Sequence, residues 1–67
     1  MKQVLLKDLK KGEWFTLKPI EEPNEMQVYV KDDYYRPEKV FICYKYGDVC
    51  YSRDFKGDRK VYTDFIF

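Results

Sequence analysis

Histidine does not occur anywhere in this sequence of 67 residues, and its absence excludes much of the common chemistry of active sites. Ser52 has no imidazole to activate it, so a hydrolytic triad is excluded. Cys43 and Cys50 have no histidine partner and form no CxxC motif, and two sulfurs alone cannot complete a tetrahedral zinc site. The sequence therefore predicts no catalytic residues, no metal site and no cofactor.

Long apolar runs are also missing. The first one ends after Leu6, which makes it shorter than the apolar part of a signal peptide and much shorter than a membrane span. We therefore expect a cytoplasmic protein that does not interact with membranes, and in this compartment both cysteines should be thiols. A loop of two or four residues between the strands that carry them would make Cys43 and Cys50 neighbours on the same face of a hairpin.

Alanine, the strongest helix former, is absent, whereas the residues that favour pleated strands, such as valine, tyrosine and phenylalanine, are common. A chain of 67 residues is too short to bury two cores, and turn-forming residues divide it at regular intervals. We predict a single all-β domain over residues 1–67, in which a five- or six-stranded antiparallel meander closes into a small SH3-like barrel. The predicted strands are residues 2–6, 13–18, 26–32, 39–46, 49–55 and 60–66.

The first of these segments has a second interpretation. Val4, Leu5 and Leu9 stand at helical spacing, and Gly12 is a suitable C-terminal cap for a short helix. We prefer a strand that ends near Leu6 and is followed by a tight turn, with the short N-terminal helix as the alternative.

Alternation along each strand separates a buried face from an outward face. The expected core residues are Phe15, Leu17, Met26, Val28, Val30, Val61, Thr63 and Phe65. Three outward rows each combine an aromatic ring with a lysine: Trp14 with Lys18, Tyr29 with Lys31, and Tyr62 with Lys60. The sequence leaves open which face of the segment 39–55 is buried.

These aromatic and basic rows have three interpretations. Proteins that bind single-stranded nucleic acid stack bases on such rings, a small sheet covers itself with them, and a protein partner can also bind them. Tyr34, Tyr35 and Arg36 fall at a predicted hairpin tip and are residue types favoured at interfaces, although the rings can also fold back over the barrel. The candidate interaction surface is Trp14, Tyr29, Tyr34, Tyr35, Arg36 and Tyr62.

The formal net charge is only +1, so no long-range field attracts the whole molecule to nucleic acid. The charges are nevertheless uneven along the chain. Five lysines stand against two acids in residues 1–20, six acids against two bases in residues 21–38, and six bases against four acids in residues 39–67. This pattern fits a self-complementary surface at least as well as a nucleic-acid groove.

The C-terminal segment, residues 62–67, offers apolar side chains on both faces up to its last residue. An unpaired strand of this composition promotes aggregation, so something must cover it. We predict a homodimer in which two copies pair along this edge, with Tyr62, Asp64, Ile66 and Phe67 at the contact. The rival prediction is that residues 3–6 pair with the last strand within one chain.

The stretches LKKGEWFTLKP (residues 9–19) and FKGDRKVYTDF (residues 55–65) resemble those of short proteins encoded by gut Bacteroidales and their mobile elements. The resemblance implies a bacterial, cytoplasmic protein with a compact β fold, and it implies no site residues. Together with the residues themselves, it leads us to expect a non-enzymatic protein-interaction module that self-associates. The alternative is a weak single-stranded nucleic-acid-binding barrel, similar in size to an OB or cold-shock domain.

Overall fold

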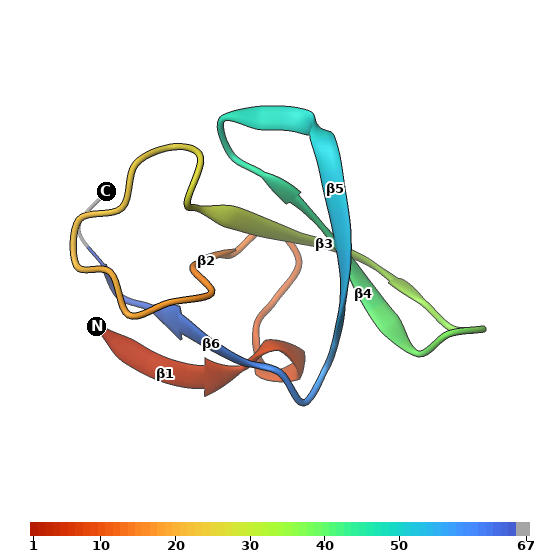
Figure 1. Cartoon of the computed structure of the whole chain (residues 1–67). Helices are drawn as coiled ribbons and strands as arrows, with labels where there is room; N and C mark the ends of the chain where they lie inside the picture. The colour runs from red at the N-terminus through yellow and green to blue at the C-terminus, as the bar shows by residue number, and fades with distance from the viewer. Residues whose placement is uncertain (66–67) are drawn as a thin grey trace.

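The computed structural model describes residues 1–65 and shows an all-β chain with six strands (Figure 1). The predicted all-β class is confirmed, and of the five or six strands that were predicted, six are present in the described residues. The elements are β1 (Lys2–Leu5), a single 3-10 turn η1 (Leu6–Asp8), β2 (Trp14–Phe15), β3 (Tyr29–Tyr35), β4 (Val40–Lys45), β5 (Asp48–Lys56) and β6 (Lys60–Thr63).

The strands form two antiparallel sheets. β2, β3, β4 and β5 follow one another in a four-stranded meander, while β1 pairs with β6, the first strand with the last. A bridge between Thr16 and Tyr62 joins the two sheets through hydrogen bonds of 2.9 and 3.0 Å. Among the described residues neither sheet closes on itself, so the structure does not show the predicted closure into an SH3-like barrel, and the meander covers four strands only.

The N-terminal segment follows the preferred prediction of a strand and a tight turn. β1 ends at Leu5, and in η1 the Leu9 N–H donates a hydrogen bond to the Leu6 carbonyl oxygen at 3.1 Å. The alternative of a regular helix is wrong, because the backbone of residues 2–5 is paired with β6. Gly12 then turns the chain towards β2 with a φ of +92°, a conformation that residues with a side chain rarely adopt.

The chain between β2 and β3 is a long loop over residues 17–28, which includes residues predicted as strand. Pro19 and Pro23 have no N–H to contribute to a ladder. Asn24 forms a turn, since its side-chain oxygen accepts a hydrogen bond from the Met26 N–H at 2.9 Å. β2 is therefore shorter than predicted, and β3 begins and ends three residues later than predicted.

The core lies where residues from both sheets and η1 meet. Phe15 is stacked on Tyr29 with ring centroids 5.8 Å apart, and both rings meet Phe55 edge-on. Burial of these rings supplies much of the driving force for folding in so small a chain. The buried members of the cluster are Leu6, Leu9, Phe15, Tyr29, Cys43, Phe55 and Val61, with Val4, Leu17 and Phe41 packed against them.

The first part of β3, residues 29–31, is buried on both faces, which corrects the predicted alternation. Val30 is buried as predicted, but Tyr29 and Lys31, which were expected to point outward, are also buried, each with only 5% exposed. Tyr29 belongs to the core cluster, whereas Val30 lies between Trp14 and Tyr44 of the adjacent strands on the other face. Alternation therefore separates Val30 from Tyr29 and Lys31 correctly, but it assigns the core face wrongly, because Tyr29 and not Val30 belongs to the core cluster.

Two further core predictions are wrong. Met26 is 47% exposed because it lies in the loop 17–28, and Thr16, predicted to point outward, is fully buried beside the bridge to β6. The Thr16 hydroxyl donates a hydrogen bond to the Lys18 carbonyl oxygen at 2.7 Å, which makes this burial tolerable. Burial is complete for Phe15, Val28 and Val61 and partial for Leu17, Thr63 and Phe65.

The β4–β5 hairpin has a two-residue turn, but residues 49–51 bulge out of β5 because its pairing with β4 shifts there. Cys43 is buried in the core, whereas Cys50 lies exposed in the bulge. Cys43 pairs with Arg53 across the ladder, so Cys50 is neither opposite nor diagonal to it. The expected closeness of the two cysteines is therefore wrong. The buried face of the hairpin is the one that carries Cys43 and Phe55.

Candidate interaction surfaces

The predicted interaction surface does not form a single patch, although one part of it stays together. Tyr34 and Tyr35 end β3, and Arg36 follows in the turn to β4. Each tyrosine is 46% exposed. Tyr34 also packs on Phe41 of β4 with ring centroids 4.7 Å apart, so this ring folds back on the sheet while it remains accessible. The tip of the β3–β4 hairpin is therefore an exposed aromatic and basic surface.

The other three predicted residues lie elsewhere. Trp14 is 42% exposed and meets Tyr46 edge-on at 5.1 Å, which places it near the β4–β5 turn, at the other end of the sheet. Tyr29 is buried in the core and forms no part of a surface, because its side of β3 is covered by Phe15 and Phe55. Tyr62 is half-buried on β6, and its backbone pairs with that of Thr16.

The backbone of β6 is paired with β1 along its whole length and, at Tyr62, also on its other side, so over the described residues the predicted dimer edge is used within the chain. Tyr62 exchanges two hydrogen bonds with Thr16 on one side, and β1 pairs along the whole of β6 on the other. The rival prediction, pairing of the first and last strands within one chain, is confirmed. Asp64 has a φ of +62° and follows the end of the strand. Ile66 and Phe67 lie outside the described residues.

Lys31, which was predicted to point outward, is a buried lysine. Its Nζ donates hydrogen bonds to the carbonyl oxygens of Leu6 (3.0 Å) and Leu9, and it lies 4.1 Å from the centroid of the Phe41 ring. Burial lowers the pKa of this ammonium group, and burial raises the pKa of the adjacent Cys43 thiol to about 11. A thiol with this pKa is protonated at neutral pH, so the pair forms a structural contact and not an activated nucleophile.

A second feature that the sequence analysis missed is a row of cations held on aromatic rings, which we call the cationic row: Lys45, Arg53 and Arg59. Lys45 Nζ lies 4.4 Å from the centroid of the Tyr51 ring, and the guanidinium carbons of Arg53 and Arg59 lie 5.2 and 5.1 Å from that of Phe55. Within residues 1–65 none of the three has a carboxylate within 4.0 Å. The alternation of Tyr51, Arg53 and Phe55 along β5 was the available signal in the sequence.

The loop 17–28 carries three exposed glutamates, and we call it the acidic loop: Glu21, Glu22 and Glu25. Its conformation is well supported, because Pro23 is buried and the Gly47 N–H of the β4–β5 turn donates a hydrogen bond to the Glu25 carbonyl oxygen at 3.1 Å. In the part of the chain that the structure describes, these glutamates form no ion pair.

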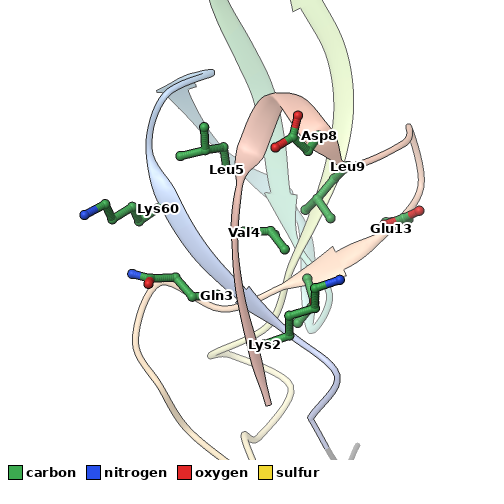
Figure 2. A pocket seen from close by; sticks show the side chains of 9 residues that line it. Lys2, Gln3, Val4, Leu5, Asp8, Leu9, Glu13 and Lys60 are labelled. Atoms are coloured by element: carbon green, nitrogen blue, oxygen red, sulfur yellow. The ribbon is translucent and has the colours of Figure 1, made fainter.

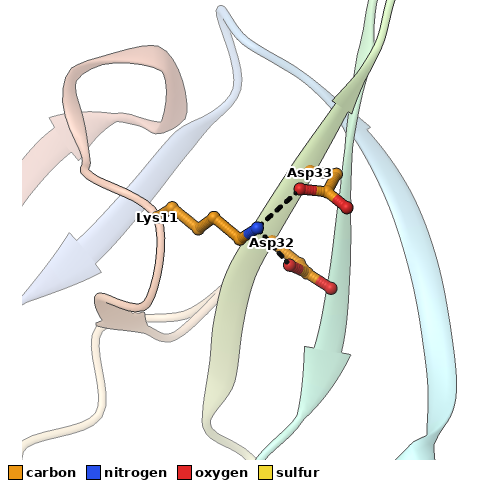
Figure 3. A network of polar contacts seen from close by, with 3 residues as sticks. All are labelled: Lys11, Asp32 and Asp33. Carbon is orange, nitrogen blue, oxygen red and sulfur yellow. Dashed lines mark hydrogen bonds and ion pairs between the residues drawn. The ribbon is translucent and has the colours of Figure 1, made fainter.

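The acids of β3 differ from those of the loop because they have a partner (Figure 3). Lys11 Nζ lies 2.8 Å from Asp33 Oδ1 and 3.6 Å from Asp32 Oδ1. The hydrogen bond and charge of Asp33, with a contribution from Asp32, raise the pKa of Lys11. All three side chains are accessible to water, so the contribution of these ion pairs to stability is small.

A depression of the surface of about 610 Å³ lies between β1 and the segment that leads into β2 (Figure 2). Figure 2 shows Lys60 on one side of β1, and Lys2, Leu9, Asp8 and Glu13 on the other. Figure 2 shows these charged groups pointing in different directions and not converging on one point. Within residues 1–65 no group of three or more histidine, cysteine, aspartate or glutamate side chains is placed to hold a metal ion.

Comparison with known proteins found no matching family model, no matching curated protein and no matching solved structure. In the described part of the chain there is no helix with the length and apolar character needed to cross a membrane.

Proposed function

We propose that this protein is a non-enzymatic protein-interaction module that self-associates. The observation that carries the proposal is a group of large apolar side chains exposed near the β4–β5 turn, which we call the apolar corner. Exposed apolar surface in such a group is typical of binding sites, and aromatic residues dominate interface energies. The exposed fractions are 42% for Trp14, 47% for Met26, 41% for Tyr46, 70% for Val49 and 42% for Tyr51.

The size of the chain supports self-association. A core of this size contributes only a few kcal/mol of net stability, roughly 3 to 5 kcal/mol, and association adds apolar burial that a single copy lacks. We also propose the SH3-like barrel as the finer description of the fold. Its support is that η1 closes against the β5–β6 turn, where Leu6 N–H and Lys7 N–H donate to the carbonyl oxygens of Arg59 (3.0 Å) and Gly57 (2.9 Å).

A bacterial origin and a cytoplasmic location belong to the same proposal. Their support is the resemblance in residues 9–19 and 55–65 and the presence of two free cysteines, Cys43 and Cys50, a state that suits a reducing compartment.

Weak binding of single-stranded nucleic acid is the second candidate function. One observation favours it, namely that the cationic row has no carboxylate partner among the described residues. Against it, the Phe55 ring that holds two of the cations is only 4% exposed and cannot stack on a base.

Sedimentation velocity, with light scattering as a second measure of mass, tests self-association over concentrations from about 5 to about 500 µM. We expect the mean mass to rise from one chain to two. The double substitution Val49→Ser, Tyr51→Ser should weaken the dimer, whereas Tyr35→Ser, at the other end of the sheet, should not. A mass of one chain at every concentration would contradict the proposal.

A further inference from the structure

We infer that two copies associate by docking the acidic loop of each copy onto the cationic row of the other. The inference rests on the proposed self-association and adds to it the charged groups that hold the two copies together. Both charged surfaces adjoin the apolar corner: Tyr51 of the corner lies under Lys45 of the cationic row, and Met26 of the corner follows Glu25 in the acidic loop.

The cationic row is prepared for binding before a partner arrives. Each of its three cations already lies over an aromatic ring, at 4.4 to 5.2 Å from the ring centroid. A side chain that is held in this way loses less conformational entropy when it forms an ion pair. Arginine is also the residue best suited to a carboxylate at an interface, because its planar group can bind both oxygens.

The acidic loop is prepared in the same way. Asn24 supports it from within, accepting the Met26 N–H at its side-chain oxygen (2.9 Å) and donating its own N–H to the Gln27 side chain (2.9 Å). The bond from Gly47 to Glu25 ties the loop to the β4–β5 turn. The loop therefore presents its glutamates from a defined position at the border of the apolar corner.

A twofold axis through the apolar corner satisfies both charged surfaces at once. Because the interface of a twofold dimer uses the same patch on each copy, a loop that meets the row of its partner offers its own row to the loop of that partner. Cations of the row then oppose glutamates of the loop at each of the two contacts. The apolar side chains of the corner are buried between the two contacts.

A polyanion fits the same region less well than a second copy. Phosphates that approached the cationic row would also approach the glutamates of the adjacent loop, and like charges in close contact disfavour a complex. The exposed ring of Tyr51 is covered on one side by Lys45, which leaves little room for base stacking. Binding of nucleic acid is therefore the alternative that the experiment must distinguish from dimerisation.

The experiment is a charge exchange between two variants of the full chain. The row variant is Arg53→Glu with Arg59→Glu, and the loop variant is Glu22→Lys with Glu25→Lys. We expect each variant alone to dimerise about tenfold more weakly or worse than the natural protein, since like charges then face each other. An equimolar mixture should restore a heterodimer, because one contact is natural and the other has both charges reversed.

The matched control is Lys2→Glu with Lys10→Glu, which changes the net charge as much as the row variant does but alters exposed lysines outside the row. This control should dimerise like the natural protein. Thermal unfolding of every variant shows whether it is folded, and the milder pair Arg53→Gln with Arg59→Gln serves if the row variant is not.

The outcomes separate the two proposals. If the natural protein has the mass of one chain up to about 500 µM, self-association fails and this inference fails with it. A natural dimer whose variants dimerise unchanged, or whose mixed variants stay monomeric, overturns the loop-to-row contact alone. Submicromolar binding of a labelled oligothymidylate that is lost in the row variant, with no dimer, overturns it in favour of nucleic acid.

Discussion

Lys31 shows how one residue can connect distant parts of a small chain. A buried ammonium group is unfavourable unless its hydrogen bonds are satisfied, and here the Leu6 and Leu9 carbonyl oxygens and the Phe41 ring satisfy it. The Leu6 carbonyl belongs to η1 and the Leu9 carbonyl to the residue that follows it, and neither residue lies in a strand. Lys31 therefore joins β3 to the segment that places Leu6 and Leu9 in the core.

The substitution Lys31→Met tests this role. Methionine keeps the approximate length of the side chain but removes the Nζ donor to both carbonyl oxygens, of which that of Leu6 keeps only the Leu9 N–H, so we expect the free energy of unfolding to fall by about 1 to 3 kcal/mol. Urea denaturation measures the change, and Lys10→Met, at an exposed position, is the control and should have little effect. Equal or greater stability of Lys31→Met would show that burying the charge outweighs its hydrogen bonds.

The natural protein and the Lys31→Met variant should differ in how their free energy of unfolding depends on pH. Burial lowers the pKa of Lys31 in the folded state, so between that pKa and the ordinary value of 10.5 the unfolded chain binds more protons than the folded chain. The stability of the natural protein relative to Lys31→Met should therefore rise as pH increases through this alkaline window, and it should be constant below it. A fall in relative stability across the window would contradict the assignment.

At the scale of elements, β5 determines how the molecule can meet a partner. It is the terminal strand of the four-stranded sheet, and its edge is interrupted by the bulge at residues 49–51 and carries Asp54 and Lys56. Bulges and charges of this kind are the usual protection of an edge strand against pairing with another chain. Association through side chains of the apolar corner is therefore more consistent with the structure than addition of a strand.

Gly47 lies in the turn of this hairpin and contacts the acidic loop. A substitution at this position therefore tests the packing of the hairpin against the loop. A Cβ atom at Gly47 would lie 2.9 Å from Glu25 Cβ and 3.1 Å from Met26 Sδ, so Gly47→Ala must push the loop away. We expect a loss of stability of about 1 to 3 kcal/mol and a weaker dimer. Thermal unfolding and sedimentation measure the two effects. Ser52→Ala, at an exposed position of β5, is the control, and a Gly47→Ala protein that matched it would contradict the contact between Gly47 and the acidic loop.

At the scale of the whole molecule, the fold rearranges charges that the sequence separates into blocks. The acidic block, residues 21–38, divides into Asp32 and Asp33, which meet Lys11, and the loop glutamates, which do not meet a cation within the described chain. The basic C-terminal block supplies the cationic row. The result is a molecule of net charge +1 in which charges of both signs, without an ion pair among the described residues, adjoin the apolar corner.

This distribution predicts weak binding to nucleic acid. Titration of labelled single-stranded DNA or RNA at about 0.15 M salt should give a Kd no tighter than about 10 µM, because so small a net charge releases few counterions. Fluorescence anisotropy measures the affinity, with Arg53→Gln, Arg59→Gln as the comparison. Submicromolar binding with a steep salt dependence, lost in that variant, would reverse the order of the two candidate functions.

The sequence alone determined the all-β class, the approximate positions of the strands and the tight turn after β1. These features depend on neighbouring residues: strand formers without alanine, turn residues between them, and alternation within each segment. For the same reason the hairpin tip at Tyr34, Tyr35 and Arg36 was predicted where it occurs. Alternation also separated the faces of β3 correctly.

Only the tertiary structure decided which faces are covered and which strands meet. β6 pairs with β1 and touches Thr16, so an edge predicted for a second copy is used within the chain. Tyr29 and Lys31 are buried because the other sheet and η1 cover their side of β3, and the bulge in β5 separates the two cysteines. Each of these outcomes depends on contacts between residues far apart in the sequence, and a pattern of period two carries no information about such contacts.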